Sequence, residues 1–248
     1  MPSAPWTPRH TAAALAGGHL LIAGAPGTGK SRLLNGTLLP ALVRAGDPLL
    51  VIQDPATGHG PTLGLRAATF GREAAVGDLL ARPTLVTFTG THPEREAQAE
   101  RLFADLPAAL AAAPAPAGAR RFLVIDVAPL TPALRSFAPL LRQARSLGCT
   151  LIVTCQSPSS LEPGLPALFT SHVAFYHFYK RCLRVMAENV LAATGAEETN
   201  PSGKPTPINR FGQPFATPAS RMVGKLGDLK VGECFLVTPG APYEPLRT

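Results

Sequence analysis

The sequence predicts an α/β fold in which a mainly parallel central sheet is flanked by helices on both faces. Three observations support this prediction: apolar runs of strand length, helical patterns between them, and a glycine-rich turn directly after the first run. The apolar runs do not alternate with polar residues, which is typical of strands buried on both faces. With 248 residues, of which 46% are hydrophobic, the chain is long enough for one sizeable domain with a buried core.

Strand and helix patterns follow one another along the chain. Apolar runs predict strands at 19–23, 49–52, 84–89, 122–126, 150–154, 173–178 and 232–237. Helical patterns predict helices at 31–45, 94–110, 131–148 and 180–193, with interruptions at Pro40 and Pro139, and short helices at 62–68 and 73–81. We expect an N-terminal arm or short helix at 1–18, the main domain at 19–194, an extended polar loop at 195–221, and a strand or hairpin at 222–248 that completes the same domain.

The turn after the first run has the spacing of a phosphate-binding P-loop. It reads Gly24-Ala25-Pro26-Gly27-Thr28-Gly29-Lys30-Ser31. Glycines let the backbone curl so that its N–H groups point at phosphate oxygens, and the following helix presents its positive dipole end to the same anion. Lys30 can reach the β- and γ-phosphates, and the Ser31 hydroxyl can coordinate Mg²⁺. These residues predict a site for ATP and Mg²⁺.

Polar side chains also follow three of the other predicted strands. They are Asp54, Asp126 and Gln156. Ligands of open α/β sheets bind outside the carboxyl ends of the strands, so we expect these side chains to lie beside the P-loop. Asp126 ends the run FLVID and is the candidate carboxylate for Mg²⁺, directly or through water, with a turn cap as the alternative role. Gln156 is a candidate for positioning water or sensing the γ-phosphate, although a strand-end glutamine alone is a weak signal.

The positive charge of the chain is concentrated in its middle third. The formal net charge is +7, and residues 119–190 hold eight basic and three acidic side chains, which accounts for +5 of it. This bias suits a polyanionic partner, above all nucleic acid, with an ordinary solubilising surface as the alternative. Lys180, Arg181 and Arg184 could line a DNA path or simply cover an exposed helix.

Several other classes of protein are disfavoured by the composition. The four cysteines have neither Cys-x-x-Cys pairing nor a histidine at zinc-ligand spacing. No apolar run approaches the length of about 18 residues that a membrane span needs. The N-terminal residues lack the charged-then-apolar order of a secretory signal. We therefore expect a cytoplasmic protein without a transmembrane segment.

The motifs and their order also resemble a known family. They are HLLIAGAPGTGKSRLLN at 19–35, LLVIQDPATG at 49–58, FLVID at 122–126 and RSLGCTLIVTCQSPSSL at 145–161. Together they are similar to the FtsK–HerA superfamily of RecA-like DNA-pumping ATPases. In that family a strand with Asp-Pro follows the P-loop helix, as Asp54-Pro55 does here. A strand ending Thr-x-Gln then follows a helix ending Arg-x-x-Gly, as Thr154 to Gln156 follow Arg145 to Gly148.

The resemblance implies a RecA-like ATPase that uses ATP and Mg²⁺ to move double-stranded DNA through the pore of a homo-oligomeric, hexameric ring. A minimal genome-packaging or DNA-transfer motor is the expected form, with a capsid or membrane vertex as a candidate docking partner and association with a virion if the chain is viral. Arg145 matches the family position before the glycine, and it is the first choice for an arginine that reaches a neighbour's γ-phosphate. Arg135 and Arg142 share its predicted helical face, and a solvated basic face is the alternative role.

Two departures from the family pattern leave the catalytic base unassigned. Val127 stands where the family usually has a glutamate, and Ala56 to His59 replace the lysine and glutamate that often follow Asp-Pro. Glu94 and Glu96 are candidate bases, and His59 is a weaker one. Two other functions therefore stay open: a nucleotide-regulated assembly protein with weak hydrolysis, and a P-loop small-molecule kinase, against which the strand-end glutamine and the Asp-Pro strand argue.

Overall fold

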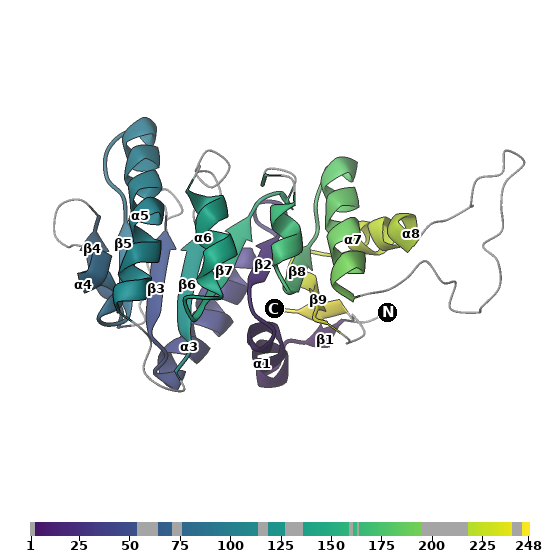
Figure 1. The fold of residues 1–248 in the computed structure, drawn as a ribbon. Coiled ribbons are helices and arrows are strands. Elements are labelled where there is room, and N and C mark those ends of the chain that lie inside the picture. Colours follow the sequence, from purple (N-terminus) through teal and green to yellow (C-terminus); the bar gives the residue numbers. More distant parts are fainter. Residues whose placement is uncertain are drawn as a thin grey trace, which may run out of the picture.

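One mixed sheet forms the middle layer of the protein (Figure 1). The computed structural model describes residues 3–53, 64–70, 76–113, 119–126, 136–158, 161–162, 164–194, 218–239 and 245–248. Over these residues the strands are β1 (Ala4–Pro5), β2 (Leu20–Ala23), β3 (Leu49–Gln53), β4 (Arg66–Thr69), β5 (Thr84–Thr87), β6 (Arg121–Asp126), β7 (Cys149–Cys155), β8 (Ser171–Phe175), β9 (Glu233–Val237) and β10 (Pro245–Arg247).

Helices occupy both faces of this sheet. They are α1 (Pro8–Ala16), α2 (Lys30–Leu33), a π-helical turn (Leu34–Leu38), α3 (Leu39–Ala45), α4 (Val76–Leu80), α5 (His92–Ala112), α6 (Phe137–Ala144), a 3-10 helix (Leu165–Leu168), α7 (Lys180–Thr194) and α8 (Pro218–Gly227). None of the described helices is both long and apolar enough to cross a membrane.

The strand order is β1-β10-β9-β8-β2-β7-β6-β3-β5-β4. From β8 to β4 every neighbouring pair is parallel, whereas β9 runs antiparallel to β8 and β10 antiparallel to β9. The P-loop strand β2 therefore lies between β7 and β8, and β7 separates it from β6. The predicted α/β architecture with a mainly parallel sheet is confirmed.

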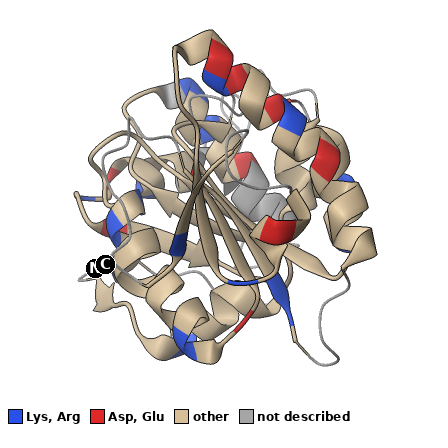
Figure 2. Ribbon diagram, turned by 90° about the vertical axis from the view of Figure 1, so that its left-hand side faces the viewer, with Lys and Arg blue, Asp and Glu red and all other residues tan. Residues whose placement is uncertain are grey.

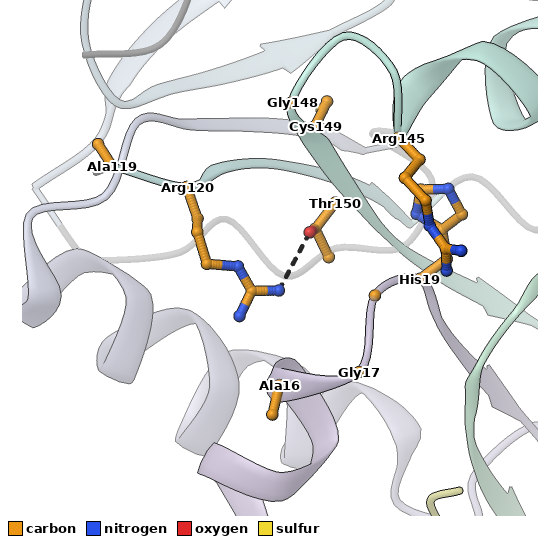
Figure 3. A pocket seen from close by; sticks show the side chains of 10 residues that line it. Ala16, Gly17, His19, Ala119, Arg120, Arg145, Gly148, Cys149 and Thr150 are labelled. Atoms are coloured by element: carbon orange, nitrogen blue, oxygen red, sulfur yellow. Dashed lines mark hydrogen bonds between the residues drawn. The ribbon is translucent and has the colours of Figure 1, made fainter. Parts of the chain in front are cut away.

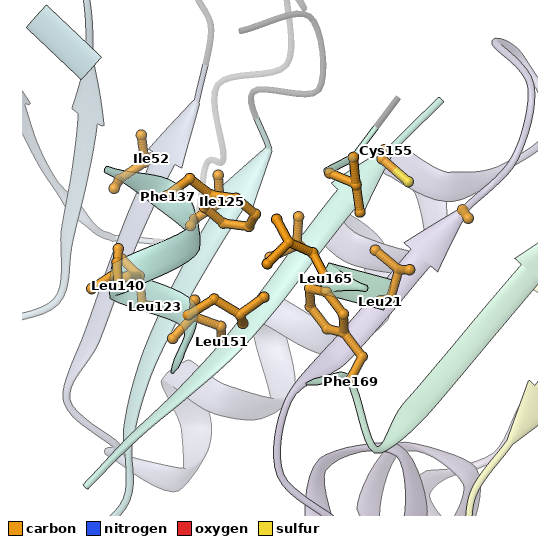
Figure 4. Packing of buried hydrophobic residues seen from close by; sticks show 14 of the residues in the cluster. Leu21, Ile52, Leu123, Ile125, Phe137, Leu140, Leu151, Cys155, Leu165 and Phe169 are labelled. Carbon is orange, nitrogen blue, oxygen red and sulfur yellow. The ribbon is translucent and has the colours of Figure 1, made fainter. Parts of the chain in front are cut away.

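Each central strand is buried on both sides, which explains why the strand sequences are continuously apolar. Alternate residues of β2, Leu20 and Ile22, pack with α1, α2 and α3 on one face. Leu21 of the same strand belongs to the larger core on the other face, under α5, α6 and α7. Figure 4 shows this second core, where Phe137 and Leu140 of α6 lie over β6 and β7.

Two expectations about local structure need correction. The range 62–68 was expected to hold a short helix, but β4 begins at Arg66 and pairs with β5 as an edge strand, so tertiary pairing overrides the local preference. Helix α8 begins at Pro218, inside the range expected to be an extended loop, and its buried Met222 and Leu226 join the larger core. Residues 195–217 lie outside the described part of the chain.

The two prolines expected to interrupt helices behave differently. Ahead of Pro40 the helix widens to a π-turn, in which the Leu39 N–H donates to the Leu34 carbonyl, and α3 then starts with Pro40 in its first turn. Pro139 lies in the first turn of α6, where a helix needs no N–H donor, so it does not interrupt the described helix. Thr131 and Pro132, the expected start of that helix, fall outside the described residues.

Two buried histidines are held in the neutral form. Burial lowers the pKa of His172 from 6.5 to about 4, although the Phe169 carbonyl 3.1 Å from its Nε2 opposes the shift. Burial, together with the charge of Arg145, lowers the pKa of His19 to about 4 as well. The Nδ1 atom of His19 accepts the N–H of Leu151 at 3.0 Å, so this ring bridges to β7. Folding therefore favours the unprotonated form of both rings.

We predict that acid weakens the fold through these rings. Below about pH 6.5 the unfolded chain binds a proton at each histidine that the folded chain does not bind until about pH 4. The free energy of unfolding should fall by about 1.4 kcal/mol per pH unit for His172 over that window. Urea denaturation at pH 7 and pH 5 measures the loss, and His172→Gln, which cannot titrate, should show a smaller one. Equal losses in the parent and the variant would contradict the assignment.

Candidate nucleotide-binding site

The P-loop has the backbone shape that its glycines permit. Gly27 and Gly29 have φ values of +74° and +116°, which side chains other than glycine rarely adopt. Gly29 is the N-cap of α2, so the loop leads directly into a helix whose first N–H groups face its concave side. Inside the loop, the hydroxyl of the buried Thr28 donates to the Ala25 carbonyl at 2.7 Å. The loop is thus ready to receive phosphate oxygens on its backbone.

Backbone hydrogen bonds to the neighbouring strands hold the P-loop in place. The Gly24 N–H donates to the Cys155 carbonyl at 3.3 Å, and the Ala25 N–H donates to the Tyr176 carbonyl at 3.0 Å. A Cβ atom on Gly24 would lie 2.5 Å from the Phe175 Cβ, so only glycine fits at this point. On the far side, the Thr28 carbonyl accepts the Gly232 N–H at 2.9 Å. The loop is fixed between the ends of β7 and β8.

Lys30 lies across the loop that it is expected to serve. Its Nζ atom donates to the carbonyls of Gly24 at 2.7 Å and Ala25 at 2.9 Å. Burial lowers the pKa of its ammonium group from 10.5, and the nearby Cys155 and Asp126 oppose that shift. The negative charge of Asp126, the predicted Mg²⁺ ligand, therefore acts on the Lys30 ammonium group. A site in which both residues serve one bound triphosphate requires this proximity.

Asp126 is held from both sides by uncharged donors. The Gln53 side chain on β3 lies opposite it in the strand register, and its Nε2 donates to Asp126 Oδ2 at 3.3 Å. On the other side, the Thr154 hydroxyl of β7 donates to Asp126 Oδ1. All three side chains are buried. This arrangement fixes the Asp126 carboxylate at the sheet edge. Neither Gln53 nor Thr154 carries a charge that would neutralise it.

The donor set fits a Mg²⁺ ion, which prefers oxygen ligands and keeps several waters. The Asp126 carboxylate and the Ser31 hydroxyl at the start of α2 are the protein oxygens that would hold it. Within the described part of the chain, no three His, Cys, Asp or Glu side chains come together as a metal site. Phosphate oxygens and water would therefore complete the ligand shell.

Gln156 lies in the bend after β7 with an exposed side chain. Its backbone accepts a hydrogen bond from His177, a buried residue after β8. His177 Nδ1 also accepts the Tyr179 N–H at 3.1 Å. Burial, and to a smaller extent the charge of Lys30, lower the pKa of His177. The ring therefore links the Gln156 bend to the start of α7.

Gln53 and His177 are the residues that sequence reasoning missed. Gln53 is the first polar side chain after a buried apolar run, and that position was the available signal. Its partner, however, depends on the β3–β6 register, which the sequence does not reveal. His177 carried no signal that separates it from a buried core histidine.

Of the candidate bases, the structure describes Glu94 and Glu96, and both have partners on α5 or at its N-terminus. Asp54, His59 and Val127 lie outside the described residues. Glu94 completes a capping box at the start of α5, where its Oε2 accepts the Thr91 N–H at 2.6 Å and the Thr91 hydroxyl at 2.8 Å. These hydrogen bonds lower the pKa of Glu94, and a weaker base is a poorer proton acceptor. The Oε1 atom of Glu96 lies 3.7 Å from the Nδ1 atom of His92 on the same helix.

Arg145 lies at the opposite edge of the sheet from the P-loop. It is exposed at the C-terminal end of α6, just before β7, and lines a pocket of about 540 Å³ together with Arg120 and His19 (Figure 3). Arg120 also donates to the Thr150 hydroxyl at 3.3 Å in this pocket. Because β7 has seven residues, its two ends are about 20 Å apart. Arg145 therefore cannot reach a phosphate on the P-loop of its own chain.

The other predicted cations differ in how they are engaged. Arg142 forms an exposed ion pair with Glu162 at 3.7 Å, and Arg184 pairs with Glu188 along α7 at 3.0 Å. Arg181 is exposed on the same helix. Arg135 lies outside the described residues. On the β4 side of the molecule, acidic and basic residues are interspersed among the described residues, as expected for a solvated surface (Figure 2).

Solved structures of proteins for genome packaging, conjugation and secretion share this fold. The genome-packaging NTPase B204 from Sulfolobus turreted icosahedral virus 2, in complex with sulfate, gives a TM-score of 0.62 at 14% identity over 93% of this chain and 96% of that chain. The bacterial conjugative coupling protein TrwB gives 0.62 at 13% identity over 92% and 84%. The cytoplasmic domain of the type VII secretion ATPase EccC from Thermomonospora curvata gives 0.55 at 20% identity over 93% and 25%.

Other structures of two of these proteins contain nucleotides: B204 with ATP-gammaS and AMPPCP, and TrwB with a non-hydrolysable GTP analogue. No protein-family model matches the chain, and no curated protein sequence does. The resemblance predicted from the sequence is confirmed at the level of the fold: the chain has the RecA-like P-loop ATPase fold that FtsK–HerA superfamily members such as B204 and TrwB display.

Proposed function

We propose that the chain is an ATPase that couples ATP hydrolysis to the movement of double-stranded DNA and works as a ring of identical copies. The observation that carries the proposal is the separation of its parts. The P-loop and Asp126 meet at one edge of the sheet, whereas Arg145 lies at the other, about 20 Å away along β7. A site divided in this way is complete only when a second copy supplies the arginine.

The residues at the P-loop edge have separate roles in this proposal. Backbone N–H groups of residues 27–31 and the Lys30 ammonium group bind the β- and γ-phosphates, and Ser31 and Asp126 hold Mg²⁺. When bound, Mg²⁺ neutralises charge that develops on the phosphate oxygens. Gln53 and Thr154 orient Asp126, and Gln156 positions water or senses loss of the γ-phosphate. Asp54 is a further candidate for nucleotide binding.

The proposal does not assign the residue that activates water for ATP hydrolysis. The residue after Asp126 is valine, and Glu94 is committed to its helix cap. These two observations favour a second candidate function, a nucleotide-regulated assembly protein that binds ATP and hydrolyses it slowly. The two candidates differ in turnover and share the nucleotide site.

The DNA partner is supported by charge and by fold. Residues 119–190 carry +5 of the net charge, and Arg181 is exposed on α7. The solved structures with this fold include a genome-packaging NTPase and a conjugative coupling protein. We therefore propose that the chain moves DNA in genome packaging or DNA transfer. Its binding to DNA should be dominated by phosphate contacts and tolerant of sequence. A capsid or membrane vertex is the candidate docking partner.

We predict that double-stranded DNA stimulates ATP hydrolysis and that the stimulation weakens steeply as salt rises. Lys30→Ala and Asp126→Asn should each lower the DNA-stimulated rate by about 100-fold or more, because each removes charge stabilisation at the phosphates. Phosphate release measured with and without DNA gives the result. ATP binding without turnover would favour the assembly protein. Phosphate transfer to a metabolite would favour a kinase.

We also predict that two inactive variants restore activity when mixed. Arg145→Ala should lower the rate by about 10³-fold while leaving ATP binding intact, because its own P-loop is unchanged. Lys30→Ala keeps Arg145 but cannot bind the phosphates. Mixed rings place an intact arginine against an intact P-loop, so part of the rate should return. Arg142→Ala is the matched control and should stay active alone. Mixtures no more active than their components would rule out an arginine shared between copies.

A further inference from the structure

The exposed large hydrophobic side chains of the described residues gather beside the P-loop. They are Phe178, Tyr179 and Val231, which are 65%, 70% and 76% exposed. We refer to these three residues as the apolar shelf. Single exposed hydrophobic residues are ordinary, but three next to one predicted ligand site indicate a surface that a ligand covers.

Hydrogen bonds and strand register place the apolar shelf at the edge of the P-loop. Strand β8 ends at Phe175, opposite Cys234 near the start of β9, so the segment after β8 and the turn before β9 emerge at the same edge of the sheet. Tyr176, two residues before Phe178, accepts the Ala25 N–H at 3.0 Å. Gly232, directly after Val231, donates to the Thr28 carbonyl at 2.9 Å.

The strand order determines which part of a nucleotide would lie there. Asp126 is at the end of β6, on one side of the P-loop strand, and β8 and β9 are on the other side. The metal and the terminal phosphates are drawn toward Asp126, which already acts on the charge of Lys30. The ribose and base must then extend away from Asp126, toward β8 and β9.

We propose that the apolar shelf binds the nucleobase of the triphosphate held by the P-loop, an inference that rests on the proposed function. The rings of Tyr176 and Phe178 meet edge to face with centroids 5.1 Å apart, and those of His177 and Tyr179 are 5.6 Å apart. Each exposed ring is thus braced by the ring two residues before it, which reduces the entropy lost when a base stacks on it. Stacking uses the face of a base rather than its hydrogen-bonding edge, so the shelf accepts either purine.

A base is a better occupant of the shelf than a DNA backbone. The three shelf side chains are apolar, whereas a DNA backbone needs cations, and the nearby Lys180, Arg181 and Lys230 flank the shelf in the sequence rather than form part of it. The shelf is also joined to the phosphate-binding backbone through Tyr176 and Gly232. That continuity points to one ligand that extends from the P-loop to the shelf.

The test compares nucleotides with a ligand that has phosphates and no base. Binding of ATP, GTP, CTP and inorganic tripolyphosphate is measured by calorimetry with Mg²⁺ present. The parent chain should bind ATP and GTP within about threefold of each other and CTP more weakly, because a pyrimidine stacks over a smaller area. It should bind tripolyphosphate about tenfold or more weakly than ATP, the scale of one lost base–aromatic stack.

Substitutions on the apolar shelf should reduce the preference for ATP over tripolyphosphate and leave the phosphate site unchanged. Tyr179→Ser, Phe178→Ser and Val231→Ser should each lower ATP affinity and leave tripolyphosphate affinity unchanged. Tyr179→Phe should keep most of the advantage. Arg101→Ala, an exposed control on α5, should bind all four ligands as the parent does.

The outcomes separate this inference from the proposed function. Equal affinity of the parent for ATP and tripolyphosphate would overturn the shelf and leave the P-loop ATPase intact. Failure of Lys30→Ala to weaken either ligand would overturn the P-loop site itself. Shelf variants that bind ATP normally and DNA poorly would assign the shelf to DNA and overturn the inference.

Discussion

The placement of β7 between β2 and β6 is the constraint on which the candidate site depends. Neighbouring strands are about 4.8 Å apart, so the end of β6 lies about 10 Å from the end of β2. That spacing leaves room for phosphate and metal between the P-loop and Asp126. It also brings the end of β7 between them, so that Thr154 reaches Asp126 and Gln156 follows directly. The P-loop takes its backbone support from the strands on both sides, through Cys155 and Tyr176.

The same strand order separates the P-loop from Arg145, the candidate arginine for a neighbour's nucleotide. Strands of a parallel sheet present their carboxyl ends at one edge, which collects the P-loop, Asp126 and Gln156. The loops that precede the strands emerge at the other edge, which is where α6 ends and Arg145 lies. An arginine on a connection that returns to the start of a strand is therefore kept away from its own nucleotide. In the proposed ring, a second copy would bring its Arg145 to this P-loop edge.

Local patterns predicted much of the fold, and long-range pairing explains most of the rest. Glycine spacing, apolar runs and the carboxylate that ends FLVID each depend on a few neighbouring residues, and each led to the correct element. β4 and α8 depend on partners elsewhere, the edge pairing with β5 and the larger core. The role of Gln53 depends on its register with β6, and that of His177 on the approach of the Gln156 bend. Neither contact leaves a signature in the local sequence.

The donors around Asp126 suit a carboxylate that must bind a cation. A buried carboxylate needs hydrogen bonds to offset the loss of water, and an arginine or lysine would supply them most strongly. A cationic partner, however, would cancel the charge that attracts Mg²⁺. Gln53 and Thr154 donate hydrogen bonds and carry no charge, so they fix the orientation of the carboxylate and preserve its attraction for a cation. A residue that only capped a turn would not need two buried strands to orient it, so this arrangement favours the metal role for Asp126 over a capping role.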